Sequence, residues 1–504
     1  MSRTLTLALS LATLAAAARP APGQGQVARK PDVRTASERA GLMLPMATTS
    51  DAAREHAVQG QRALDMGHQY DAYDHFREAV AADSTFAFGY LGVANSAIST
   101  DELRANIARA VHFAPKATRE DQLQIGIAEK GLSNDVDGEL ALARELVRVA
   151  PDNPRSYLAL ATVQSQAGKE TEARRSMRRA IALAPDFAPA YLQLGNSYLL
   201  TEPRDFARAE QAARKAAAIA PREFAPYDLL GDVDRATGKL ADARVAYTRA
   251  ATLDPTNGLE YQQRGHVNTF LGNYDAARAD YDTAIRLGRG NEKATFAVWR
   301  ALVPVYAGEP KAGIAELEQL VSSIDGMSIP DPDGTKIFAL SEEAVIASHT
   351  GAFDAARSAL DRRSALLRKQ AAASGNEEFR RAQEADIAVF DGILAARKGD
   401  YAAATAKAKE AMRTVATNHN PRRDEPAQAL MGYIALMQKH YDAALAHFAK
   451  ADPNDIYVTY HRALALEGAG RTADAKKLFR QVANYNFSSA TYAVVRRDAI
   501  ERAR

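Results

Sequence analysis

Apolar and small residues recur along this chain at spacings that predict a long series of helices. Pro151, Pro185, Pro221 and Pro255 lie 34, 36 and 34 residues apart. A tyrosine follows each of these prolines by six residues, and a small residue follows each tyrosine by four. These small residues are Ala161, Gly195, Gly231 and Gly265. A pattern that returns at a fixed period of this length is typical of stacked repeats.

The second half of each period carries an alanine, a bulky residue four positions later and a further alanine three positions after that. Two examples are Ala243-Tyr247-Ala250 and Ala277-Tyr281-Ala284. A period of 34 residues accommodates two helices of about 14 residues joined by short turns. Small residues at the eighth and twentieth positions let the two helices approach closely, and the bulky residue at position 24 fills the space between neighbouring units. The proline near position 32 ends the second helix.

This spacing resembles that of the tetratricopeptide repeat family, over residues 51–485 and about twelve units. The resemblance implies an all-α fold, an α-solenoid that winds as a right-handed superhelix. We expect a signal peptide at 1–24, a flexible linker at 25–50, a first array at 51–325, a second at 335–487 and a capping helix at 488–504. The Pro- and Gly-rich stretch 326–334 separates the arrays, and 417–425 is predicted to be a second surface loop.

The first residues predict export. Arg3 precedes a largely apolar stretch, residues 5–18, and small residues follow it. This is the pattern of a secretory signal peptide, and the stretch is short for a membrane span. An uncleaved N-terminal anchor is the alternative. The chain has no cysteine, which excludes disulfides and a lipid-modified N-terminal cysteine. We therefore expect a periplasmic or secreted protein without membrane insertion after cleavage.

Composition agrees with a helical protein whose partner is not a nucleic acid. Helix-favouring Ala, Leu and Arg are abundant, and the formal net charge is only +2. Such a balance gives no reason to expect a polyanion as the partner. The basic run at Arg174, Arg175, Arg178 and Arg179 is interpreted as a solvated helix face.

No catalytic residue, cofactor or metal site is predicted. The chain lacks a phosphate-binding glycine loop, a nucleophile elbow and a His-Glu-x-x-His pair. His419 is the only histidine of the 417–425 loop and is interpreted as solvated, and Asp331 to Gly334 as a turn that lacks the later ligands of a calcium loop.

The resemblance places the first helix of each repeat on the concave side, with positions 2, 5, 9 and 12 facing the groove. Ala128 occupies position 9 of the third repeat. We expect the other residues at positions 5, 9 and 12 to contact a partner, and these are Gln61, Asn95, Thr162, Asn196, Asp228, Asp232, Arg235, Gln262, His266 and Thr269.

Polar side chains of this kind can hydrogen-bond the backbone of a bound peptide, although any exposed groove is polar. The Lys and Asn set with which some family members hold a terminal carboxylate is not found. An internal peptide segment or a folded partner is therefore favoured.

The sequence thus favours a non-catalytic scaffold or adaptor of the bacterial cell envelope that binds a peptide or a partner protein. A binding protein for a small peptide or a sugar chain is the first alternative. An enzyme, or a regulatory subunit of an envelope enzyme, is the second.

Overall fold

The computed structural model describes residues 42–504 apart from residue 98. The predicted signal peptide and residues 25–41 of the expected linker lie outside the described residues. The described part contains 25 α-helices, two short 3-10 helices and no strand, which confirms the all-α solenoid fold. The twenty-four helices α3–α26 form twelve consecutive pairs, and α27 follows them.

Two compact units divide the chain, with the boundary inside the sixth pair. Among the described residues, unit 1 contains 42–233 and 245–255, and unit 2 contains 234–244 and 256–504. The helices of the first six pairs are α3 (Asp51–Asp65), α4 (Gln69–Ala82), α5 (Ala87–Asn95), α6 (Thr100–Phe113), α7 (Arg119–Leu132), α8 (Val136–Val149), α9 (Pro154–Gln166), α10 (Glu170–Leu183), α11 (Ala188–Leu200), α12 (Phe206–Ile219), α13 (Ala225–Ala236) and α14 (Leu240–Leu253).

Unit 2 continues with longer and less regular pairs. Its helices are α15 (Gly258–Leu271), α16 (Tyr274–Leu287), α17 (Asn291–Ala307), α18 (Pro310–Ser323), α19 (Pro332–Thr350), α20 (Phe353–Ser374), α21 (Glu377–Arg397), α22 (Tyr401–Thr414), α23 (Glu425–Met437), α24 (Tyr441–Phe448), α25 (Ile456–Gly468), α26 (Thr472–Ala483) and α27 (Ala490–Ala503). The 3-10 helices are η1 (Ala114–Lys116) and η2 (Ile324–Gly326). The expected break at 326–334 lies inside unit 2, between α18 and α19, and 417–425 joins α22 to α23.

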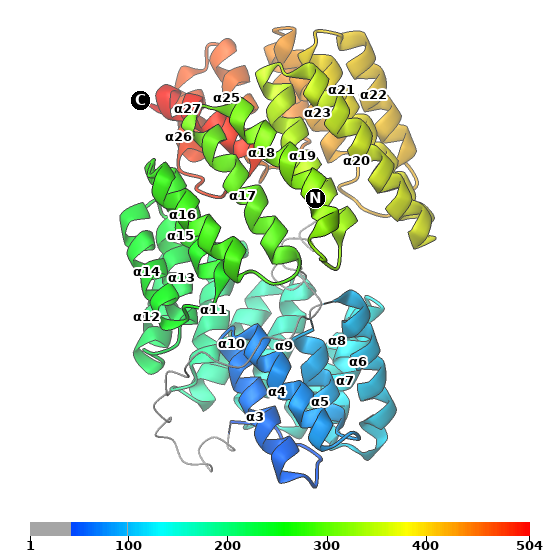
Figure 1. Ribbon diagram of the computed structural model, residues 1–504, viewed down its shortest axis with the longest axis vertical. Coiled ribbons are helices and arrows are strands. Elements are labelled where there is room, and N and C mark those ends of the chain that lie inside the picture. The colour runs from blue at the N-terminus through cyan, green and yellow to red at the C-terminus, as the bar shows by residue number, and fades with distance from the viewer. Residues whose placement is uncertain (1–41, 98) are drawn as a thin grey trace. The chain divides into compact units, whose positions relative to one another are not determined.

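From α3 to α12 and from α15 to α27, each helix packs on the next one along the chain, and several first helices of neighbouring pairs also touch, such as α3 and α5 in unit 1 and α17 and α19 in unit 2 (Figure 1). Side-chain caps mark many helix starts: Thr118 Oγ1 accepts from the N–H of Asp121, and Asn153 Oδ1 from that of Arg155. A glycine with positive φ ends several first helices, as at Gly168 (φ 71°) and Gly272 (φ 79°). Glycine adopts this conformation without a steric penalty, so these residues allow the tight turn inside each pair.

The predicted close approach of helices at small residues is confirmed. A Cβ built on Gly60 of α3 would lie 2.9 Å from the Phe76 ring of α4, and one on Gly92 of α5 would lie 2.1 Å from the same ring. Phe76 is fully buried. A single aromatic side chain therefore fills the space between one pair and the next, as the repeat pattern predicts.

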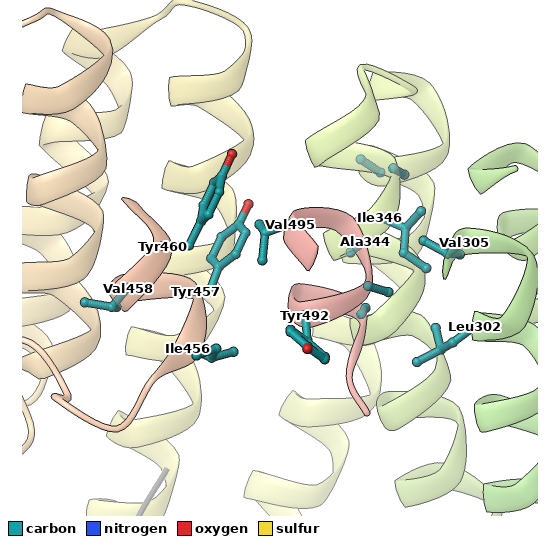
Figure 2. Close-up of a cluster of buried hydrophobic side chains, with 14 of the residues drawn as sticks. Leu302, Val305, Ala344, Ile346, Ile456, Tyr457, Val458, Tyr460, Tyr492 and Val495 are labelled. Atoms are coloured by element: carbon teal, nitrogen blue, oxygen red, sulfur yellow. The ribbon is translucent and has the colours of Figure 1, made fainter. Parts of the chain in front are cut away.

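The last helix, α27, fills the interior of unit 2. It packs on its predecessor α26, as expected of a cap, and also on α17, α19 and α25. Figure 2 shows Tyr492 and Val495 of α27 between Tyr457 and Tyr460 of α25 on one side and Leu302 and Ile346 on the other. All four flanking residues belong to the buried core of unit 2. Because α17, α19 and α25 are the first helices of their pairs, α27 covers their inner faces.

None of the described helices combines the length and the apolar character that crossing a membrane requires.

Candidate binding surface of the first unit

Residues 42–50, which we call the strap, run in a non-helical conformation ahead of α3. Two strap side chains are buried, Leu44 with 4% of its surface exposed and Met43 with 9%. The interpretation of this part of 25–50 as a flexible linker is therefore wrong. Its apolar residues make the difference, since burying a leucine or methionine side chain contributes about 1.5–3 kcal/mol.

The apolar side chains of the strap insert between helices of several pairs. Leu44 belongs to a buried cluster with Leu123 of α7 and Leu146 of α8. Leu42 packs against a second cluster around Phe187, just before α11. Met43 is part of the core formed by the first two pairs. The strap thus lies between the first pair and the pairs that follow it.

Polar contacts hold the strap mainly through its backbone. The partners come from the end of the first pair and from the starts of the third and fourth pairs, and they are Asp83, Thr118, Asp121, Asn153 and Arg155. The carbonyl oxygens of Leu42, Met43 and Pro45 accept from Arg155 Nε at 2.5 Å, Asn153 Nδ2 at 3.1 Å and Thr118 Oγ1 at 3.0 Å, respectively.

Two further contacts complete the set made by these five residues, and Arg54 of α3 also donates to the carbonyl oxygens of Met46 and Thr48 at 3.2 and 2.6 Å. The N–H of Ala47 donates to Asp121 Oδ2 at 3.2 Å, and Thr48 Oγ1 donates to Asp83 Oδ2 at 2.6 Å. Four of the five bonds use strap backbone atoms, and backbone atoms are the same in every peptide except at proline nitrogen. Most of the polar contacts between this surface and the strap therefore do not depend on the strap's side chains.

Arg155 contacts the strap, the first pair and an aromatic ring at the same time. Its guanidinium forms a bidentate pair with Asp65 at the end of α3, at 2.9 and 2.5 Å, while Nε holds the strap. The guanidinium carbon also lies 5.0 Å from the centre of the Phe187 ring. Both partners of the ion pair are nearly buried, with side-chain exposures of 13% and 11%. Planar bidentate pairing of this kind fixes orientation as well as distance.

Asp121 is fully buried under the strap. Burial raises the pKa of its carboxyl to about 6, against the opposing effect of hydrogen bonds from Ala47 and Thr118. Its Oδ1 atom has no hydrogen-bond partner. The Asp121 carboxyl is therefore partly protonated near pH 6, where it can still accept from Ala47.

Comparison with known proteins identifies the repeats of which these pairs consist. A family model described as tetratricopeptide repeat matches residues 154–187, which contain α9 and α10, and residues 261–289, which contain most of α15 and α16. This chain is a tetratricopeptide repeat protein. Proteins of this family generally mediate protein–protein interaction and are generally non-catalytic.

Known relatives of this tetratricopeptide repeat protein match parts of it. Anaphase-promoting complex subunit 3 of Schizosaccharomyces pombe is 28% identical over 179 residues, which are 36% of this chain and 26% of that subunit. The crystal structure of MamA is 23% identical and covers 32% of this chain and 93% of its own, with a TM-score of 0.29. A tetratricopeptide repeat protein from Parabacteroides merdae is 12% identical and covers 54% and 93%, with a TM-score of 0.33.

In this tetratricopeptide repeat protein, three predicted groove residues of unit 1 are exposed, and they are Asn95, Thr162 and Asn196. Thr162 Oγ1 accepts from Gln193 Nε2 at 2.7 Å, so neighbouring first helices are linked there. The other three are partly buried: Gln61 donates to Asp65 at 3.0 Å, Asp232 accepts from the Tyr247 hydroxyl at 2.7 Å, and Asp228 lies on α13.

The predicted groove residues of unit 2 include three buried ones, Arg235, His266 and Thr269, with exposed fractions of 6%, 4% and 2%. His266 lies 2.7 Å from the Tyr281 hydroxyl and 2.9 Å from Gln262 Nε2. Burial, and to a lesser degree the charge of Arg235, hold the pKa of its imidazole well below the usual range. The expectation that these three contact a partner is corrected, because their side chains are packed inside unit 2.

The strap partners were missed by the sequence reasoning. Asp121 and Arg155 occupy position 2 of their repeats, which the family pattern places in the groove, but only positions 5, 9 and 12 were assigned residues. Thr118 and Asn153 precede helices and are recognisable as N-caps. The repeat pattern does place position 2 in the groove. The repeat period could not indicate, however, that residues 42–50 lie against Asp121 and Arg155.

A buried polar cluster in unit 2 surrounds Arg397. Its Nη2 atom donates to the Tyr457 hydroxyl at 2.7 Å and lies 3.1 Å from His349 Nδ1 and 3.4 Å from His461 Nε2. Burial and the guanidinium charge lower the pKa of His349 to about 3. The imidazole is therefore neutral at ordinary pH, and the cluster acts as a hydrogen-bonded support between α19, α21 and α25.

Proposed function

We propose that this chain is a non-catalytic interaction scaffold that binds a short non-helical segment of a partner protein along the first helices of unit 1. The strap is the observation that supports this function, because these helices hold a peptide through its backbone. Pockets for Leu42 and Leu44 add a preference for apolar side chains without requiring one sequence. The exposed residues Asn95, Thr162 and Asn196 provide further donors and acceptors on the same series of helices.

The cellular place that we propose is the bacterial cell envelope, as a periplasmic or secreted protein. Support comes from the apolar stretch at residues 5–18 and the small residues after it. N-terminal sequencing of protein recovered from an envelope fraction tests the proposal. A mature chain that begins after residue 18 and before residue 42 is expected, whereas a chain that starts at Met1 and stays in the cytoplasm would contradict it.

The binding proposal is tested by site-specific photo-crosslinking in cells. A photo-crosslinking residue replaces Asn196 on α11, and in a matched control it replaces Arg175, which is exposed on α10, the second helix of its pair. We expect one partner segment to be captured at position 196 and not at position 175, because only the first helices line the binding surface.

Mass spectrometry of the crosslinked peptide then identifies the segment. An excess of a synthetic peptide with the sequence of residues 42–50 should reduce the capture. Equal capture at both positions, or capture that the strap peptide leaves unchanged, would overturn the proposal.

A further inference from the structure

Two histidines and a glutamate of the first pair converge on one point. His56 lies on α3, and His75 and Glu78 lie one helical turn apart on α4. His56 Nδ1 is 3.0 Å from Glu78 Oε2, and His75 Nδ1 is 3.9 Å from the same oxygen. All three atoms lie within 4.8 Å of one another. We propose that His56, His75 and Glu78 bind one Zn²⁺ ion.

The distances suit a tetrahedral ion. Zinc binds imidazole nitrogen and carboxylate oxygen at about 2.0–2.2 Å, so two ligand atoms of a tetrahedral site lie about 3.3 Å apart. The observed separations of 3.0 and 3.9 Å lie on either side of this value. Small rotations about the side-chain bonds bring the three atoms to coordinating distance. Two imidazoles and one carboxylate also favour zinc over magnesium or calcium, which prefer oxygen ligands alone.

The surroundings of the two nitrogens favour an ion over a simple ion pair. Both Nδ1 atoms are buried, and neither has a hydrogen-bond partner despite the nearby carboxylate. A buried polar atom without a partner costs about 1–3 kcal/mol, and coordination to a metal would remove this cost. The rings themselves are about one third exposed, at 33% and 32%, which leaves a path for the ion from solvent.

Three protein ligands leave a fourth position for water or for a group of another molecule. The ion would also link α3 to α4, the pair against which the strap packs, and it would therefore stabilise unit 1. This site does not depend on the peptide-binding function proposed above, and neither proposal fails with the other.

Isothermal titration of Zn²⁺ into the full chain, produced without a histidine tag and stripped with a chelator, tests the proposal. The variants are His56→Gln, His75→Gln and Glu78→Gln, in which the two histidines are partly exposed and the glutamate is exposed. His112→Gln is the matched control, because His112 is an exposed histidine of the same unit on α6.

We expect one Zn²⁺ per chain in wild type and in His112→Gln, and an affinity at least about tenfold weaker in each of the three site variants. Zinc should raise the thermal unfolding midpoint of the wild type but not that of His56→Gln. With Co²⁺ in place of zinc, the intense visible bands of a tetrahedral site should appear in the wild type and in His112→Gln but not in the three site variants. Absence of stoichiometric binding, or binding that the site variants retain, would overturn the proposal.

Discussion

At the scale of single residues, Arg174 links two pairs of unit 1. Its side chain is 6% exposed and donates to the carbonyls of Ser197, Thr201 and Pro203 at 2.8–2.9 Å. Thr201 and Pro203 follow the end of α11, so Arg174 satisfies carbonyls of the turn after that helix, and it adds a second donor to the Ser197 carbonyl, which also accepts from the N–H of Thr201. The basic run that contains Arg174 is consequently not a uniform solvated face, and that interpretation is wrong for this residue.

Replacing Arg174 with alanine should destabilise unit 1 by about 3–5 kcal/mol. The substitution removes the guanidinium donors of the three carbonyls and leaves the buried carboxylate of Glu170 without its cation. Arg175→Ala is the matched control, since Arg175 is exposed and should change stability by less than about 0.5 kcal/mol. Urea unfolding followed by circular dichroism measures both variants. Similar losses for the two would contradict this account of Arg174.

His68 predicts a pH dependence of unit 1. Its ring nitrogens lie 3.0 Å from Asp254 Oδ2 and 3.0 Å from Glu223 Oε2, so the turn of the first pair is tied to residues near the sixth. Burial lowers the pKa of His68, but the hydrogen bonds and charges of Asp254 and Glu223 outweigh it and raise the pKa to about 9. The stabilisation is therefore fully present below about pH 6.5 and is lost as the pH rises through 9.

In the wild type, the free energy of unfolding of unit 1 should fall by about 2 kcal/mol between pH 6.5 and 9.5 relative to the His68→Gln variant. The glutamine side chain cannot titrate, so the difference between the two proteins isolates the imidazole from all other groups. Thermal unfolding at pH 6, 7.5 and 9.5 measures it. A difference that stays constant over this range would show that His68 does not carry its charge in the folded state.

At the scale of elements, glycines and aromatic residues set how closely the helices pack. Phe76 of α4 lies against Gly60 of its own pair and Gly92 of the next pair. This arrangement could be predicted from the sequence because it depends only on the repeat period and on side-chain size. The first helix of the second pair has only nine residues, and Gly92 within it still lies against Phe76.

Gly92→Ala should destabilise unit 1 by about 1–3 kcal/mol, because the added Cβ would overlap the Phe76 ring in a core that cannot expand freely. The same substitution in a Phe76→Leu background should cost less, since the smaller side chain leaves room. A double-mutant cycle on the free energies of unfolding measures this coupling. Additive effects would mean that the clash is relieved elsewhere, by movement of α5.

At the scale of the whole molecule, the twelve helix pairs follow from periodicity, but the segments at the two ends do not. The strap has no repeat period, and its hydrogen bonds join residues up to 113 positions apart. The sequence of α27, the helix at the other end, likewise contains nothing that indicates α17 or α19 as its packing partners. The expectation that His266 contacts a partner was wrong for the same reason. The repeat period identified position 9, but the burial of His266 depends on Trp299 and Phe270, which lie on two different helices. The repeat pattern does not determine which distant residues an irregular or terminal segment packs against.

The place of α27 leads to a prediction for unit 2. Tyr492 is fully buried, with its ring 5.9 Å from that of Phe270 and 6.0 Å from that of Tyr306, and the N–H of Ala490 donates to Glu342 Oε2 at 2.6 Å. Removing residues 489–504 would expose the apolar inner faces of α17, α19 and α25 to water. We therefore expect the truncated chain to bind a hydrophobic dye and to associate at micromolar concentration, as large exposed apolar surfaces do.

The effect should be concentrated in unit 2, because α17, α19, α25 and α26, on which α27 packs, all belong to that unit. Hydrogen exchange measured by mass spectrometry should show faster exchange in α17, α19 and α25 and unchanged exchange in α3–α12. Tyr492→Ala, which keeps α27 and removes one buried ring, should give the same pattern in weaker form, with a loss of about 3–5 kcal/mol. If the hydrogen-exchange rates of the truncated chain equalled those of the full chain, α27 would not be needed for the stability of the core of unit 2. If α3–α12 also lost protection, the two units would unfold as one cooperative body, and the stability of the first unit would depend on the last helix of the second.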